Sequence, residues 1–463
     1  MFEAKIYSNR RNQLKKQVKS GVLLFLGNDE SPMNYPDNAY TFRQDSSFLY
    51  YWGLESPGLA AVIDLDENRE ILFGYDFTVD DTVWMGPQPS LTDRAALAGV
   101  KEAKPSTKLD EYIRGAIKSG RRVHFLPPYR AENRLRLSKL TGIRPDTLNH
   151  YVSEELIRAV VGQRSVKADE ETEQIEKAHD IAYQMQTTAM KMTRPGLYER
   201  DIVGAMTGIA NAMGSGISFP VIFSIHGETL HNHHHENKMS DGNLVVNDSG
   251  AESILHYASD ITRTFPVNGK FSERQKEIYS IVLNAQMSAI DAIRPGVLYR
   301  DVHLMAAKVI AGGLKDLGLM KGDTDEAVKN GAHALFFPHG LGHMMGLDVH
   351  DMEDLGENYV GYDESVTRSK QFGLAYLRLA KKLIAGNVLT VEPGIYFIPE
   401  LIRQWKAEKK LVKFLNYDKI ESYIGFGGIR IEDDVLVTES GRRVFGKPIP
   451  KTIDEVEAAV SKK

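Results

Sequence analysis

Four acidic residues of this chain stand in or beside short β-rich runs, where carboxylates are uncommon. Asp248 ends the apolar run in GNLVVNDSGAE, and Asp260 lies in the β-rich segment HYASDITRTFPV. Glu392 ends the run in NVLTVEPGIYF, where a Pro-Gly pair turns the chain, and Glu432 lies in a further strand in GFGGIRIEDDVLV. Strands disfavour Asp and Glu unless a charge partner is near. One such acid is typical of a surface or turn, but four predict a shared divalent cation.

Histidine is concentrated in two segments. The first, FFPHGLGHMMGLDVHD, holds His339, His343 and His350 around a glycine-rich turn and could complete the acidic set with an imidazole. The second, LHNHHHENK, packs four histidines and a glutamate between His231 and Glu236. The chain has no cysteine, which excludes thiolate metal sites, thiolate nucleophiles and disulfides. Any metal site must therefore use oxygen and imidazole donors.

These motifs resemble the metallopeptidase family that contains aminopeptidase P, prolidase and methionine aminopeptidase, whose catalytic domain has the pita-bread fold. The resemblance covers about residues 165 to 450 and rests on HGLGHMMGLDVHD, VLTVEPGIY and GIRIEDDVLVTESG. The family's ligand set is Asp, Asp, His, Glu and Glu around two metal ions. The resemblance implies that the metals are held by the matching positions, Asp248, Asp260, His343, Glu392 and Glu432.

The chemistry of such a site follows from its donor types. Two hard cations about 3.5–4 Å apart need bridging carboxylates, and together they can hold a hydroxide at neutral pH and polarise a carbonyl group. A carboxylate-dominated set with one imidazole suits Mn²⁺, and Co²⁺, Zn²⁺ or Fe²⁺ can also occupy it. We expect two divalent ions, with Mn²⁺ as the first choice.

The resemblance also implies roles for side chains around the metals. His231 matches a histidine that lines the family's substrate pocket. His339 and His350 match histidines used around the scissile carbonyl and the proline subsite. Imidazole suits such work because it can donate to a developing oxyanion or exchange a proton near neutral pH. Glu392 is the candidate proton shuttle as well as a ligand.

Three further features of the site are expected. Arg378, in YLRLAKKLIAG, aligns with an arginine that contacts the substrate carboxylate in prolidases, and an exposed helix arginine is the alternative. His233, His234 and His235 are expected in a polar loop near the pocket rim. Thirteen residues run from Asp248 to Asp260 inclusive, one more than the family pattern, which predicts a longer hairpin turn and leaves the strand register open.

Two domains are expected to position these residues. Residues 1–165 alternate strand-like runs, such as GVLLFLG, LAAVIDLD and EILFGYD, with helical patterns and read as a small α/β domain. Residues 166–463 open with a long helix for which Asp169 is the expected N-cap. The apolar positions of this helix recur at helical spacing: Ile175, Ala178, Ala182 and Met185.

The second domain contains an internal echo. MKMTRPGLYERDIVGAM (Met190–Met206) is answered about 100 residues later by IDAIRPGVLYRDVHLMA (Ile290–Ala306). In both segments a helix stops at Arg-Pro-Gly and an acidic start opens the next helix. We predict a pseudo-symmetric α+β catalytic domain with its site between the two halves. The fold class expected overall is two-domain α/β, with an N-terminal creatinase/aminopeptidase P-like domain and a C-terminal pita-bread domain.

The first domain narrows the expected substrate. YTFRQDSSFLYYWGLESPGLAAVIDLD and VWMG resemble the N-terminal domain of aminopeptidase P and of eukaryotic-type prolidase, which implies cleavage of an Xaa-Pro bond. The resemblance favours an Xaa-Pro aminopeptidase. A prolidase restricted to dipeptides remains open because residues 399–426 look like an excursion of eukaryotic-type prolidases. A non-catalytic peptide-binding domain of the same fold is the more distant alternative.

Composition limits the partners and the location. The net charge of −5, from 57 basic and 62 acidic residues, implies neither nucleic acid nor an anionic membrane as a partner. The run VLLFL near the N-terminus is too short for a signal segment or a membrane span, so a cytoplasmic location is expected. The resemblance implies a homodimer or homotetramer, with the N-terminal domain in oligomer contacts and at the substrate entrance. Proline-containing peptides are the expected substrates.

Overall fold

The computed structural model describes residues 1–461, and the chain divides into two compact units. The first unit combines residues 1–164 with residues 354–359, and the second unit holds the rest. The short segment 354–359 belongs to the first unit although it lies far from residues 1–164 in the chain, and its sequence did not predict this. Within that unit the guanidinium of Arg158 lies 5.1 Å from the ring centre of Tyr359.

The first unit is built on a mixed five-stranded sheet in the order β4-β3-β2-β1-β5. The three strand-like runs expected from the sequence are confirmed as β1, β2 and β3, which pair antiparallel in sequence order. The outer strands β4 and β5 pair parallel to β3 and β1. Its helices and strands, in chain order, are α1 (Ala4–Gln17), β1 (Val22–Leu26), α2 (Ser46–Trp52), β2 (Ala60–Asp64), β3 (Arg69–Gly74), α3 (Val79–Met85), α4 (Leu91–Leu97), β4 (Glu102–Pro105), α5 (Leu109–Lys118), β5 (Val123–His124), α6 (Ala131–Thr141) and α7 (Glu154–Arg164).

One face of this sheet forms a buried apolar cluster of the first unit. Leu24, Val62 and Ile71 stand opposite one another across the three central strands. All three are buried in one apolar cluster with Leu109 and Ile113 of α5. Because side chains of a strand alternate between faces, the alternate apolar residues of each strand supply this core.

The second unit contains two helix pairs and several short sheets. Sheets β10-β8-β7 and β11-β14-β15 have three strands each, and β12 pairs with β13. Its elements, in chain order, are α8 (Asp169–Met192), α9 (Glu199–Met213), β6 (Gly216–Ile217), β7 (Ile222–Ser224), β8 (Leu244–Ser249), β9 (Ala251–Glu252), β10 (Ile261–Pro266), α10 (Glu273–Ala292), α11 (Tyr299–Asp316), α12 (Thr324–Lys329), α13 (Glu357–Val360, shared with the first unit), β11 (Val388–Val391), β12 (Gly394–Tyr396), α14 (Pro399–Ala407), α15 (Tyr417–Glu421), β13 (Gly428–Arg430), β14 (Asp433–Thr438), β15 (Gly441–Val444) and α16 (Ile453–Ser461).

The long first helix of this unit, α8, is present, but its expected cap is wrong. Ala168 occupies the N-cap position and Asp169 is the first helical residue. The side chain of Glu171 reaches back and accepts a hydrogen bond of 3.1 Å from the backbone N–H of Ala168. The carboxylate of Glu171, in the first turn of the helix, therefore accepts the otherwise unpaired N–H at the N-cap position. The four expected apolar positions are all buried.

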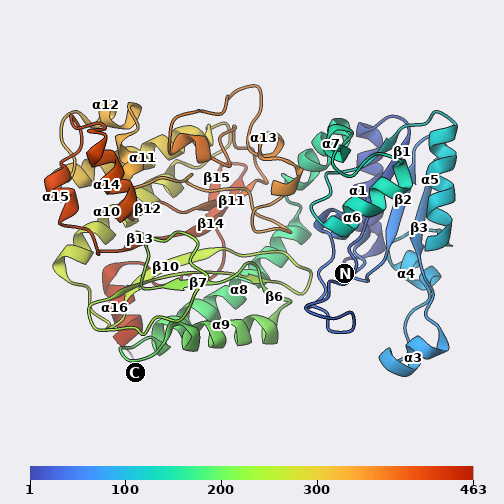
Figure 1. The fold of residues 1–463 in the computed structure, drawn as a ribbon, viewed down its shortest axis with the longest axis horizontal. Helices are drawn as coiled ribbons and strands as arrows, with labels where there is room; N and C mark the ends of the chain where they lie inside the picture. The colour runs from blue at the N-terminus through green and yellow to red at the C-terminus, as the bar shows by residue number, and fades with distance from the viewer. Residues whose placement is uncertain (462–463) are drawn as a thin grey trace. The chain divides into compact units, whose positions relative to one another are not determined.

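The internal echo corresponds to two similar helix pairs, α8–α9 and α10–α11, which carry green and yellow to orange colours in Figure 1. In each connecting loop the glycine of Arg-Pro-Gly, Gly196 or Gly296, has a positive φ that a side chain would strain. Each glycine also donates its N–H to a returning segment, Gly196 to Met239 and Gly296 to Leu383. α8 packs against β8 and β10, whereas α10 packs against β11 and β13. No helix within residues 1–461 is long and apolar enough to span a membrane.

Candidate metal centre and its pocket

Asp248 and Asp260 come from the two strands of one hairpin. β8 and β10 pair antiparallel with Asp248 opposite Thr262, and Asp260 precedes Thr262 by two residues. Because strand side chains alternate, this register directs both aspartates to the same side. Asp260 stands just before β10 instead of inside it, and its backbone N–H donates to Asp434 Oδ2 at 2.8 Å. The register left open by the spacing is therefore one that brings the two aspartates together.

The two glutamates stand where strands end. Glu392 directly follows β11, as expected, and its N–H donates to the carbonyl of Leu341 at 2.8 Å. Glu432 does not lie inside a strand, because the chain bends there between β13 and β14. Its N–H donates to the carbonyl of Thr262, and its Oε2 accepts from the hydroxyl of Thr262 at 2.6 Å. Thr262 thus fixes both the backbone and the carboxylate of Glu432.

His343 is held against β11 by close backbone contact. A Cβ on the preceding Gly342 would lie 2.1 Å from the carbonyl oxygen of Thr390, so only glycine permits this approach. The imidazole Nδ1 lies 3.0 Å from the carbonyl of Met344, and a carbonyl only accepts, so Nδ1 carries the hydrogen. Nε2 is therefore the lone-pair atom. It lies 3.4 Å from Asp260 Oδ2 and 3.6 Å from Glu392 Oε1.

This arrangement fits divalent cations. One ligand atom each from Asp260, His343 and Glu432 lies within 4.8 Å of the others, close enough for a single ion. Asp248 and Glu392 line the same pocket. Within residues 1–461, Oδ1 of Asp248 and Oδ1 of Asp260 are buried without a hydrogen-bond partner. A buried carboxylate oxygen without a partner is costly, and a cation bound by oxygen and imidazole donors would satisfy it.

The electrostatics of the acids lead to the same conclusion. Burial and the charges of Glu432 and Asp248 raise the pKa of Asp260 well above its usual value. Burial and the charges of Glu392 and Asp248 do the same for the pKa of Glu432. Burial is also the main cause that raises the pKa of Glu392 to about 7, with Arg430 opposing it. The carboxylates repel one another, and positive charge between them would relieve that repulsion.

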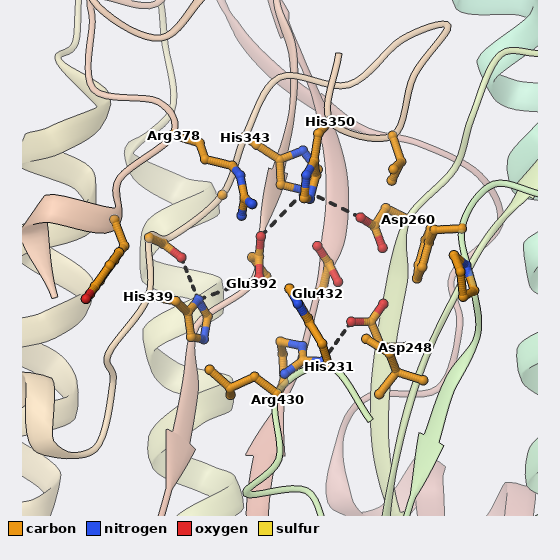
Figure 2. A pocket seen from close by; sticks show the side chains of 18 of the residues that line it. His231, Asp248, Asp260, His339, His343, His350, Arg378, Glu392, Arg430 and Glu432 are labelled. Atoms are coloured by element: carbon orange, nitrogen blue, oxygen red, sulfur yellow. Dashed lines mark hydrogen bonds and ion pairs between the residues drawn. The ribbon is translucent and has the colours of Figure 1, made fainter. Parts of the chain in front are cut away.

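The acids open into a pocket of about 350 Å³. Figure 2 shows the labelled side chains converging on this space from several strands and loops. The expected pocket residues His231, His339, His350 and Arg378 all line it. Phe219, Pro220 and Leu230 add apolar surface to the wall. The pocket thus combines charged donors with an apolar side, as peptide sites do.

Arg430 is a functional candidate that sequence reasoning missed. Its buried guanidinium donates from Nη2 to Asp248 Oδ2 at 2.7 Å and from Nη1 to the hydroxyl of Tyr396 at 2.8 Å. Tyr396 lies 2.9 Å from Nε2 of His339, whose Nδ1 lies 2.8 Å from the carbonyl of Gly340. Both nitrogens of His339 are therefore engaged, and burial lowers the pKa of His339 to about 3. The signal was available in GFGGIRIEDD, where an arginine precedes a ligand candidate by two residues in a buried strand.

Arg378 is not on a helix, so the alternative of an exposed helix arginine is wrong. It follows a short 3₁₀ turn, Leu374–Tyr376, and points into the pocket (Figure 2). Its Nε lies 3.3 Å from Oε2 of Glu353. The same oxygen lies 2.5 Å from Nδ1 of His350, whose ring centre is 4.2 Å from that of His343. Sequence reasoning did not single out Glu353.

The conspicuous histidine cluster forms a loop, and its members separate. His231 and His233 line the pocket with ring centres 6.5 Å apart. His234 is exposed, and Nδ1 of His235 lies 3.3 Å from the carbonyl of Phe223. Among the residues that the structure describes, none of these histidines belongs to the group close enough to hold an ion.

Comparison with known proteins agrees with this geometry. Residues 173–439 match the model of metallopeptidase family M24, and residues 7–124 match that of the aminopeptidase P N-terminal domain. The chain belongs to metallopeptidase family M24. This metallopeptidase is 31% identical to human Xaa-Pro dipeptidase over 96% of its own length and 90% of the relative's. It is 32% identical to a probable Xaa-Pro aminopeptidase of Sordaria macrospora, over 95% and 91%.

Solved structures confirm the expected fold class of the metallopeptidase. An aminopeptidase PepP from Pseudomonas aeruginosa matches with a TM-score of 0.82 and 28% identity. Escherichia coli aminopeptidase P, in complex with substrate, matches with a TM-score of 0.81 and 29% identity. Both matches cover 99% of this chain and 98% of the other. The metallopeptidase therefore has the two-domain aminopeptidase P fold with a pita-bread catalytic domain.

Proposed function

We propose that this metallopeptidase hydrolyses the Xaa-Pro bond at the N-terminus of peptides, as an Xaa-Pro aminopeptidase. The observation that carries the proposal is the convergence of four carboxylates and an imidazole in one pocket beside four further histidines. Relatives named Xaa-Pro dipeptidase and Xaa-Pro aminopeptidase support the choice of bond. Solved structures of aminopeptidases P favour the aminopeptidase.

The proposed cofactor is a pair of divalent ions, with Mn²⁺ first and Co²⁺, Zn²⁺ or Fe²⁺ as alternatives. The residues that would hold them are Asp248, Asp260, His343, Glu392 and Glu432. When bound, such ions activate water and polarise the scissile carbonyl. The donor set supports this assignment because it offers four carboxylates, one imidazole and two buried oxygens without a partner in the described chain.

The protein's own groups supply proton transfer and orientation. Hydrolysis breaks the C–N bond before proline, so the proline nitrogen must receive a proton as it leaves. Glu392 lies on the pocket wall, where its carboxylate can relay that proton. The Glu353 contact engages Nδ1 of His350, so Nε2 of His350 is the atom left to meet the scissile carbonyl. His231 is exposed and lines the pocket, where it can contact a bound peptide.

For His339 only the proline-subsite part of its expected role is proposed. Because both of its ring nitrogens are engaged, we propose that it shapes the wall of the proline subsite and exchanges no proton. Its ring centre lies 4.9 Å from that of Phe337 and 5.4 Å from that of Tyr396. Such a wall suits the flat apolar face of a proline ring.

Two observations support a dipeptidase as the second candidate. Residues 399–426 form an excursion with helices α14 and α15, which resembles that of eukaryotic-type prolidases. Arg378 lies in the pocket, where it could pair with a free carboxylate. A non-catalytic binding role is disfavoured because every ligand candidate is present.

The protein is proposed to form a homodimer or homotetramer through a surface of the first unit. The helix α3 exposes Val79, Val83 and Trp84, three large apolar side chains in one turn and a half. Apolar side chains gathered in this way are typical of an interaction site. Light scattering on the purified protein would give the mass, and a monomer would contradict the proposal.

The test of the proposed function is hydrolysis of three substrates: Ala-Pro, Ala-Pro-Ala and a longer Xaa-Pro peptide. The protein is reloaded with Mn²⁺, and a chelator-treated sample is the control. Cleavage of the longer peptides is expected. Cleavage of Ala-Pro alone would make the protein a dipeptidase. No cleavage of any substrate by metal-loaded protein would contradict an Xaa-Pro peptidase.

A further inference from the structure

Glu353 joins two pocket side chains through one carboxylate. Its Oε2 lies 2.5 Å from Nδ1 of His350 and 3.3 Å from Nε of Arg378. His350 and Arg378 both line the pocket. All three side chains keep part of their surface in solvent, 41% for Glu353, 30% for His350 and 35% for Arg378. Glu353 stands behind these two lining residues, so a bound peptide that reaches this wall meets an arginine already paired with a carboxylate.

We propose that Glu353 is a specificity residue that disfavours substrates with a free carboxylate on the proline, and thereby favours peptides longer than Xaa-Pro dipeptides. The inference rests on the proposed function. A dipeptide presents its proline carboxylate to the pocket, whereas a longer peptide presents a neutral amide at the same place. Glu353 already offsets the charge of Arg378 and repels a second carboxylate that approaches it.

The other arginine of the pocket offers no replacement. Arg430 is buried and donates to the ligand candidate Asp248 at 2.7 Å. Both arginines that line the pocket are thus matched with a carboxylate of this chain. The net positive charge available to bind a substrate carboxylate is therefore reduced at Arg378 and at Arg430.

The backbone around Arg378 is fixed, so its approach to Glu353 is built into the fold. A Cβ on Gly361 would lie 1.7 Å from the carbonyl oxygen of Arg378, which leaves room for glycine alone. The hydroxyl of Tyr362 donates to the carbonyl of Leu377 at 2.7 Å, and Ala380 donates its N–H to Gly361. Tyr362, Leu377 and Ala380 belong to one small buried cluster under this loop.

Two substitutions separate the charge of Glu353 from its contact with His350. Glu353→Gln removes the negative charge but keeps an amide oxygen that can accept from Nδ1 of His350. Glu353→Ala removes both. Glu364→Gln is the matched control, because Glu364 is an exposed glutamate that is not among the residues lining the pocket. Arg378→Gln, alone and combined with Glu353→Gln, completes a double-mutant cycle.

The experiment compares Ala-Pro with Ala-Pro-amide, which differ only in the carboxylate, using Mn²⁺-loaded protein. Glu353→Gln should raise kcat/KM for Ala-Pro about three- to fivefold through KM, the range expected for a partly exposed charge pair. Ala-Pro-amide and Ala-Pro-Ala should show only the change in kcat that an altered contact with His350 causes, which Ala-Pro shares, so the ratio of kcat/KM for Ala-Pro to that for Ala-Pro-amide should rise. In the Arg378→Gln background the gain should be smaller, and Glu364→Gln should leave both substrates unchanged.

Three outcomes decide the matter. An unchanged ratio of Ala-Pro to Ala-Pro-amide in Glu353→Gln would overturn the inference. An equal loss of kcat on both substrates, with KM constant, would reduce Glu353 to positioning His350 and would overturn it as well. If wild-type protein cleaves nothing, the proposed function fails, and calorimetric dissociation constants for the same two ligands then test the inference by the same ratio.

Discussion

His303 and His333 lie together in the interior of the second unit. Both rings are fully buried, with centres 6.2 Å apart. Within residues 1–461, none of their four ring nitrogens has a hydrogen-bond partner. Burial lowers the pKa of His333 to about 4, against about 6.5 in an unfolded chain. Between these values the unfolded chain binds a proton at His333 that the folded chain does not.

This difference makes the free energy of unfolding depend on pH. A buried base with a lowered pKa contributes fully at pH 7, and the contribution is lost as pH falls from about 6.5 to about 4. At 1.36 kcal/mol per pH unit, the loss attributable to His333 reaches about 3 kcal/mol. His333→Leu should remove this part of the pH dependence because leucine does not titrate. The difference in unfolding free energy between variant and wild type should therefore grow by about 3 kcal/mol on acidification.

The assay is urea unfolding at several pH values between 7 and 4, with the transition of the second unit followed by fluorescence and circular dichroism. His150→Gln serves as the control because His150 is exposed. It should follow the wild type throughout. Parallel loss of stability in wild type and His333→Leu would refute the reasoning, since it would show that His333 takes up its proton without cost in the folded state.

Three other outcomes follow from the site. Asp260→Ala should abolish Mn²⁺-dependent peptide hydrolysis while far-ultraviolet circular dichroism stays unchanged, and full activity would place the ions elsewhere. Arg430→Met should lower the free energy of unfolding by about 3–5 kcal/mol, measured in urea, because Asp248 loses its buried partner. A urea unfolding midpoint equal to that of wild type would show that another group offsets the buried charge of Asp248. Chelator treatment should lower the melting temperature, because an ion supplied at 100 times its Kd stabilises the folded state by about 2.7 kcal/mol. An unchanged melting temperature would contradict the metal site.

Local sequence pattern predicted the elements well where the signal was itself local. Strands β1, β2 and β3, the long helix α8 and the repeated Arg-Pro-Gly turn were all readable because alternation, helical spacing and helix stops act over a few residues. The failures were at element ends. Asp169 was expected to cap α8 and Glu432 to lie within a strand. Backbone bonds from distant segments decide such ends, as the contact of Glu432 with Thr262 shows.

The sequence by itself determined the family, the fold class and the candidate site residues, because unusual residue types in strand and turn motifs are visible one segment at a time. Only the tertiary structure decided which of these residues meet. Arg430 reaches Asp248 across 182 positions of the chain. Glu353 joins His350 to Arg378 through one oxygen. Such pairs depend on strand register and loop packing. The sequence of either segment alone does not indicate which distant residue it will contact.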